Sequence, residues 1–207
     1  MDQAPARLNF VFLQWHSVLY LEERYISSSS LVYYSQSQVV FVDTAGDLCL
    51  QRLFQVAEAR GCSREKVEKA LERVMIAKAW DPTQILTTIE QLDEIQPDLI
   101  VIDNLSIPFM PMVTNNNLAA AFAAGSRVVQ ALRKISTATA PPPVILTTSN
   151  LRAGRDLEPA PALGGVFRGL ADTRVLVTRV DATTLKAAIV RGLTGFCNYS
   201  LEKSGVT

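Results

Sequence analysis

The residues that could carry out catalysis or hold a metal are few and widely spaced in this chain. The 207 residues include one histidine, His16, and three cysteines, Cys49, Cys62 and Cys197, with no C-x-x-C pair among them. Nucleophilic triads, Cys-His dyads and histidine-rich zinc sites depend on an imidazole or on paired thiolates. The sequence therefore does not favour these chemistries, and it predicts neither a metal site nor a cofactor.

Basic residues are concentrated in the second half of the chain. Its 20 basic and 20 acidic residues cancel, but residues 41–126 carry a net charge of −5 and residues 127–191 a net charge of +6. Three of these basic residues, Arg152, Arg155 and Arg168, belong to the Gly- and Pro-rich stretch 151–169. Arginine on a pliable segment can pair with phosphate oxygens. The segment is either a nucleic-acid contact or an ordinary solvated loop.

The elements that must position these residues alternate between strands and helices. Apolar runs predict strands, and apolar residues at helical spacing predict helices. The strands are expected at 39–42, 74–77, 99–102, 144–148, 174–178 and 185–190, and the helices at 50–60, 63–71, 82–96 and 118–137. This order indicates an α/β fold with a mainly parallel central sheet, flanked by helices and closed by a C-terminal β-hairpin that turns at Asp181. We interpret residues 1–207 as one domain.

Two apolar segments fit less easily into this scheme. Residues 104–117 carry no charge and are predicted as a loop, in which Phe109, Met110 and Met112 are either core residues or a partner surface. The segment from Phe10 to Leu21, which includes Trp15, is interrupted by polar residues and is shorter than a bilayer span. It lacks a secretory signal pattern, so we expect an intracellular protein without membrane contact. We expect this segment to pack on the sheet, or to bind a second subunit.

The order of the motifs resembles the ATPase core of the RecA-type recombinases, especially the eukaryotic recombinase paralogues. Residues 39–46 (VVFVDTAG), followed by Gln51-Arg52-Leu53, resemble the second core strand of this family and its D-T-E-G turn. Residues 99–103 (LIVID) resemble the Walker B strand. Residues 148–150 (TSN) resemble the T-N-Q that begins the second DNA-binding loop, and residues 161–174 resemble the segment that ends it. The resemblance implies a RecA-like fold over residues 38–205 and a vestigial nucleotide site at Asp43, Asp103 and Asn150.

Two departures from the family pattern indicate a degenerate ATPase core. None of the ten glycines is followed by lysine, so this chain lacks the G-x-x-x-x-G-K-[ST] loop whose backbone amides and lysine cradle phosphates. Ala45 occupies the position at which active members of the family place the glutamate that orients the attacking water. We therefore expect a chain that is not an enzyme, in which the divergent residues 1–38 replace the phosphate-loop region.

The resemblance implies a non-catalytic recombinase paralogue, similar to the subunits of Shu complexes. Such a chain acts in the nucleus, as a DNA-binding and interaction subunit of a heteromeric complex that promotes recombinase filament assembly in homologous recombination and repair. Its implied partners are single-stranded or branched DNA bound through the complex, another paralogue or a SWIM-type zinc protein, and the filament itself. Two alternatives remain: an ATP-binding or ATPase subunit that borrows phosphate contacts from a neighbouring chain, and a structural adaptor without DNA contact.

Overall fold

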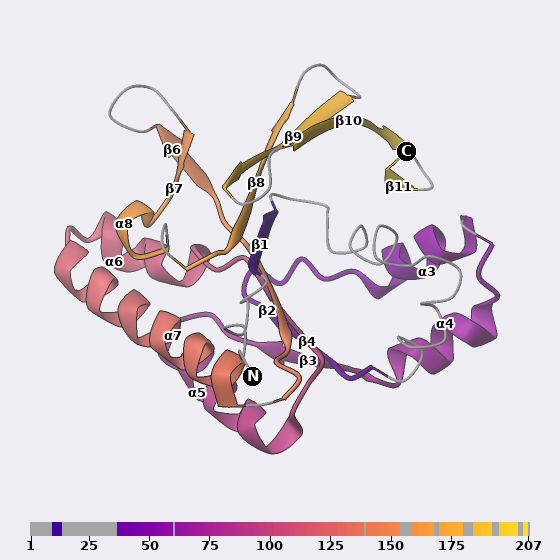
Figure 1. Cartoon of the computed structure of the whole chain (residues 1–207), viewed down its shortest axis with the longest axis horizontal. Helices are drawn as coiled ribbons and strands as arrows, with labels where there is room; N and C mark the ends of the chain where they lie inside the picture. Colours follow the sequence, from indigo (N-terminus) through magenta and orange to yellow (C-terminus); the bar gives the residue numbers. More distant parts are fainter. Residues whose placement is uncertain are drawn as a thin grey trace, which may run out of the picture.

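The computed structural model has a central β-sheet with helices on both of its faces (Figure 1). It describes the backbone of residues 10–13, 37–59, 61–138, 140–153, 159–167, 170–179, 184–191, 195–202 and 205–206. Side chains are described over a narrower set, which leaves out residues 10–13, 152–161, 164–165, 178–185 and 190–207.

The main sheet of the described residues has nine strands in the order β11-β10-β9-β8-β1-β5-β4-β2-β3. The strands from β8 to β3 run parallel to one another, and β9, β10 and β11 are added antiparallel beyond β8. This arrangement confirms the predicted parallel sheet and the hairpin, which β8 and β9 form. The strands are β1 (Phe10–Leu13), β2 (Val39–Asp43), β3 (Val74–Lys78), β4 (Leu99–Asp103), β5 (Val144–Thr148), β8 (Thr173–Arg179), β9 (Thr184–Arg191), β10 (Gly195–Glu202) and β11 (Gly205–Val206).

Strand β1 corrects, for residues 10–13, the expectation that the N-terminal segment packs on the sheet. Residues Phe10–Leu13 lie within the sheet, paired in parallel with Ile145–Thr148 of β5 on one side and with residues 173–174 of β8 on the other. A short, wholly apolar run suits a position between two parallel neighbours, because such strands are buried on both faces. Trp15 and the other residues between β1 and Ser37 lie outside the described part of the chain.

The helices occupy opposite faces of the sheet because the connections step across it in opposite directions. The chain moves outward from β2 to β3 through α3 (Leu50–Ala59) and α4 (Arg64–Leu71). It then steps back through α5 (Pro82–Ile95) to β4, and through α7 (Leu118–Ala138) to β5. Right-handed crossovers place helices from opposite steps on opposite faces. Figure 1 shows α5 and α7 on one side of the strands, and α3 and α4 on the other.

The helix boundaries follow the predicted capping signals closely. The side chain of Asp81 accepts hydrogen bonds from the amides of Thr83 and Gln84 at the start of α5, where Pro82 occupies the first turn. Gly61 follows α3 with a φ of 79°, a conformation that favours glycine. Ser63 precedes α4 but makes no side-chain cap hydrogen bond. Local chemistry therefore fixes where α5 begins more firmly than where α4 begins.

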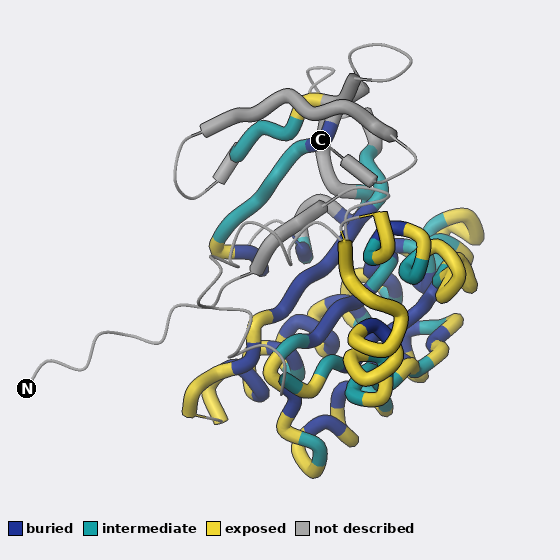
Figure 2. The backbone as a smooth tube through the Cα atoms, turned by 90° about the vertical axis from the view of Figure 1, so that its right-hand side faces the viewer, coloured by how far each residue is buried: buried dark blue, intermediate teal, exposed yellow. Residues whose placement is uncertain are grey.

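The hydrophobic core lies between the sheet and the α5–α7 layer. Alternate residues of β2, β4 and β5, including Val42, Ile100 and Ile145, point into it. Ile85 and Ile89 of α5 meet them from the helix side. A smaller cluster on the opposite face holds Phe41, Val101 and Leu146. Figure 2 shows buried backbone running through the middle of the molecule, with exposed residues on the outer sides of the helices. Each fully buried aliphatic side chain contributes about 1.5–3 kcal/mol of transfer free energy.

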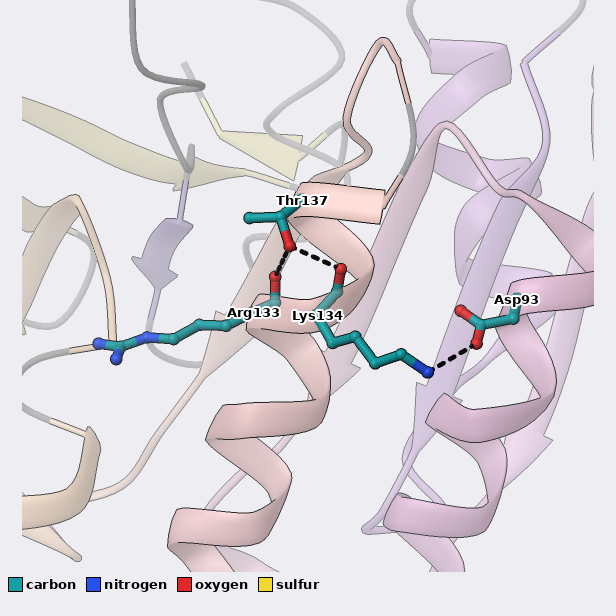
Figure 3. Close-up of polar contacts among 4 residues, drawn as sticks. All are labelled: Asp93, Arg133, Lys134 and Thr137. Carbon is teal, nitrogen blue, oxygen red and sulfur yellow. Dashed lines mark hydrogen bonds and ion pairs between the residues drawn. The ribbon is translucent and has the colours of Figure 1, made fainter.

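Helices α5 and α7 also meet through polar groups at their surface (Figure 3). The ammonium group of Lys134 on α7 pairs with the carboxylate of Asp93 on α5 at 3.3 Å. Beside it, the hydroxyl of Thr137 donates to the carbonyl oxygens of Arg133 and Lys134. The Arg133 side chain extends in the opposite direction from Lys134. The α5–α7 layer therefore has an exposed ion pair at its rim and apolar contacts beneath.

Two segments predicted as loops contain short helices and strands in the structure. Residues 104–117 contain a 3-10 turn, η2 (Ile107–Phe109), and a short helix, α6 (Met110–Thr114). The stretch 151–169 contains an antiparallel pair, β6 (Leu151–Ala153) and β7 (Pro159–Pro161), followed by α8 (Gly164–Phe167). Prolines and asparagines marked residues 104–117 as a loop, and glycines and prolines marked 151–169. Pro108 and Pro111, however, lie in first turns of helices, where no amide donor is needed. Among the described residues, no helix is long and apolar enough to cross a membrane.

Candidate functional site

Most of the buried polar side chains in the described structure gather at one place, the carboxyl ends of β2, β4 and β5. The group comprises Asp43, Thr44, Asn104, Ser106, Thr147, Thr148 and Ser149. Burying polar groups is costly unless they are hydrogen-bonded, so such a concentration has to be accounted for. In open parallel sheets, ligands bind outside the carboxyl ends of the strands. This edge is therefore the candidate site.

The two acidic residues of the predicted vestigial nucleotide site lie side by side. Asp43 of β2 and Asp103 of β4 are partners in register, so their side chains leave the same face of the sheet. One carboxylate oxygen of Asp43 accepts from the amides of Ala45 and Gly46, at 3.2 and 2.7 Å. The carboxylate of Asp103 accepts from the hydroxyl of Thr148. Both carboxylates thus stabilise nearby segments of the same chain. Asp43 stabilises the turn that follows it, and Asp103 connects β4 to β5.

The turn after β4 is tied to the turn after β2 by a reciprocal pair of hydrogen bonds. The backbone amide of Asn104 donates to the hydroxyl oxygen of Thr44 at 2.6 Å, and that hydroxyl donates to the carbonyl of Asn104 at 2.7 Å. The Asn104 side-chain oxygen accepts from the amide and the hydroxyl of Ser106, at 3.0 and 2.7 Å. The polar groups of this turn are therefore satisfied within the chain.

Asn150, the third residue of the predicted vestigial site, joins the same network from β5. Its side-chain oxygen accepts from the Asn104 amide group at 2.9 Å, and its backbone amide donates to the Ser106 hydroxyl at 3.0 Å. The structure therefore brings Asp43, Asp103 and Asn150 to one edge of the sheet. Asn150 contacts the turn after β4. Within the described residues, no group of three or more His, Cys, Asp or Glu side chains is placed to hold a metal ion.

Thr44, Asn104 and Ser106 were not among the site residues predicted from the sequence. Each of them follows a predicted strand. This position could have indicated a site residue, because the turns after parallel strands meet at one edge of the sheet. Their mutual contacts, however, depend on β4 lying between β2 and β5, and no short pattern specifies that order. Polar residues in turns are common for local reasons.

The predicted DNA-binding arginines are only partly covered by the described residues. The backbone of Arg152 lies in β6, opposite Ala160 of β7. The side chain of Arg152, and Arg155 and Arg168 entirely, lie outside the described part of the chain. Their role in binding DNA stays a prediction.

The residues considered for a partner interface have three different outcomes in the structure. Phe109 is fully buried, and its ring packs edge-to-face on Phe167 with centroids 5.5 Å apart. Of the two alternatives for Phe109, core residue or partner surface, its burial supports the first, because the turn η2 directs its ring into the core of this chain. Met110 and Met112 are half-buried on α6, and Met112 packs against the edge of the same core. Trp15 falls outside the described residues.

The sheet and its flanking helices define the fold class of the protein. A mainly parallel sheet flanked by helices, with antiparallel strands added at its C-terminal side, is a RecA-like α/β fold. No family model matches the chain. The chain is similar to "DNA repair protein RAD51 homolog 4" of Bos taurus, with 24% identity over 162 residues, which cover 72% of this chain and 48% of that protein. This chain thus spans about half the length of the curated relative that it matches. The similarity supports the resemblance to the RecA-type recombinase family.

Proposed function

We propose that this chain is a non-catalytic recombinase paralogue, a DNA-binding and interaction subunit of a nuclear heteromeric complex that promotes recombinase filament assembly. Similarity to a DNA repair protein over most of the chain supports a role in homologous recombination and repair. The finer assignment rests on one structural observation. The arm formed by β6 and β7, which carries Arg152, begins directly after Asn150 at the carboxyl end of β5.

The proposal that the chain lacks ATPase activity rests on its residues. The chain has no glycine-lysine step for a phosphate loop, and Ala45 replaces the catalytic glutamate of the family. One carboxylate oxygen of Asp43 accepts two backbone amides of its own turn, and the carboxylate of Asp103 accepts the Thr148 hydroxyl. These groups therefore serve as structural acceptors in this chain. The partner expected by resemblance is another paralogue or a SWIM-type zinc protein.

Charge reversal on the arm segment tests the DNA-binding assignment. The chain is co-purified with its partner, and binding to single-stranded and branched DNA is measured across a salt series. Replacing Arg152, Arg155 and Arg168 with glutamate should weaken binding steeply and flatten its salt dependence, because phosphate contacts release counterions. The matched control reverses three exposed basic residues elsewhere, Lys66, Lys78 and Arg127, which makes the same change in net charge. Equal losses in both variants, or none in either, would contradict the assignment.

Nucleotide assays on the same complex test the alternative function. The in-register carboxylates of Asp43 and Asp103 at the sheet edge are the observation that favours a nucleotide-binding subunit. If that alternative is correct, the complex binds ATP, and Asp103→Ala abolishes the binding contributed by this chain. Our proposal predicts no ATP turnover by the isolated chain. Capture of the partner without any DNA shift would instead favour a structural adaptor.

A further inference from the structure

The β6–β7 arm is hydrogen-bonded to itself as a separate two-stranded sheet. In the described structure, β6 pairs with β7, and neither strand is a member of the nine-stranded sheet. Figure 1 shows the arm rising away from the main sheet above α8. Among the described residues no sheet ladder holds the arm to the main sheet, so hydrogen bonds at its base help to set its orientation.

Asn150 supplies those contacts with three of its groups. It immediately precedes β6, and its carbonyl oxygen accepts from the amide of Ala162, which immediately follows β7, at 2.9 Å. Its amide donates to the Ser106 hydroxyl, and its side-chain oxygen accepts from Asn104. One residue therefore closes the base of the arm and connects it to the turn after β4.

The connection continues into the interior through buried groups. Thr44, Asn104 and Ser106 are each at most 2% exposed. Asn104 binds Thr44 through its backbone and Ser106 through its side chain, so the turn that holds Asn150 is itself held from β2. Removing one of these hydrogen-bonding groups would leave another buried polar group without a partner. Such an unsatisfied group lowers the stability of the folded chain considerably.

We propose that Asn104, Ser106 and Asn150 form a latch that sets the orientation of the β6–β7 arm on the end of the sheet. They are positioning residues, because they act on the arm and not on a ligand. The proposal deepens the proposed function, since the arm carries Arg152, but its main test does not involve DNA.

Hydrogen exchange of the full chain, followed by mass spectrometry of peptides covering residues 150–162, tests the latch. Ser106→Ala removes the acceptor for the Asn150 amide and should speed exchange in these peptides about fivefold. Asn150→Ala should also speed exchange in these peptides. Because Asn150 is only half-buried, this variant should fold even if Ser106→Ala does not. Asn150→Asp keeps the acceptor for Asn104 and should leave exchange in the arm close to that of the unmodified chain.

Ser136→Ala is the matched control. Ser136 is also a buried serine, but its hydroxyl donates to the Arg133 carbonyl within α7, away from the arm. It should lower thermal stability without a selective change in peptides 150–162. Unchanged exchange in the arm for both Ser106→Ala and Asn150→Ala, or an equal increase in Ser136→Ala, would overturn the latch. Faster exchange in the arm of these two variants, together with unchanged DNA binding by the charge-reversed arginine variant, would keep the latch and remove the arginine assignment, so the two proposals can fail separately.

Discussion

Phe109 and Phe167 pack edge-to-face, with ring centroids 5.5 Å apart and ring planes 71° apart, and both side chains are fully buried. Phe109 ends the turn after β4, and Phe167 ends α8, which follows the β6–β7 arm. The aromatic pair thus joins the same two connections that the Asn104–Asn150 contact joins at the sheet edge. Apolar packing below and hydrogen bonds above hold these connections together.

Truncating this pair should reduce stability strongly. Phe109→Ala is expected to lower the free energy of unfolding by about 3–5 kcal/mol, because it removes a fully buried ring and leaves a cavity. Met110→Ala, at the neighbouring half-buried position, should cost much less. Urea denaturation of both variants measures the difference. A small loss for Phe109→Ala, with a large loss of binding to a partner, would restore the interface assignment of this residue.

Gly46 and Gly61 should respond differently to alanine, although both have φ near 80°. Each substitution places a side chain in the left-handed region, at a cost of about 1–2 kcal/mol. At Gly46 the new Cβ would also lie 3.0 Å from the Trp80 ring, whereas nothing lies within 4 Å at Gly61. Thermal unfolding should therefore show a larger loss for Gly46→Ala. Adding Trp80→Ala should recover the excess, and equal losses at the two glycines would refute the contact.

The caps of α4 and α5 should differ in strength. Asp81→Ala removes an acceptor used by two amides and should cost about 1 kcal/mol. Ser63→Ala removes a side chain that makes no cap hydrogen bond, and it should change stability by a few tenths of a kcal/mol or less, roughly the surface background. Chemical denaturation of the two variants at one pH measures the difference in their free energies of unfolding. Similar losses would mean that Ser63 caps α4 in solution.

The ion pair between Lys134 and Asp93 should contribute little. Its side chains are 73% and 48% exposed, so water and salt screen the attraction. A double-mutant cycle with Lys134→Ala and Asp93→Ala should give a coupling energy of about 0.5 kcal/mol or less, falling as salt is added. A coupling well above 1 kcal/mol that persisted in high salt would show that the pair has a structural role.

Locally encoded features could be predicted from the sequence, and features set by strand order could not. Asp81 and Pro82 signal the start of α5, and Gly61 signals the end of α3, so both boundaries could be predicted. The acids at the sheet edge were found as well, because apolar strands end directly before or at them. Thr44, Asn104 and Ser106 were missed, because three polar turn residues become a network only when their strands are neighbours.

The positions of some apolar residues could not be predicted from the sequence either. Phe109 fitted a core or a partner surface equally well, since composition does not say which way a turn directs a ring. Strand β1 is only four residues long, and its place is decided by partners far along the chain, at Ile145–Thr148 and residues 173–174. Periodicity over four residues cannot carry that information.

The position of β1 has a consequence for how the protein is made. Among the described strands, β1 joins β8 and its antiparallel neighbours to β5 and the rest of the parallel sheet. It is synthesised before every other strand of this sheet, yet β5 and β8 leave the ribosome only after most of the chain. Pairing over such sequence separations is slow, because loop closure must precede the contacts that reward it. We therefore expect β1, although it precedes the other strands, to enter the sheet only once β5 has been synthesised, and to remain an unpaired apolar segment until then.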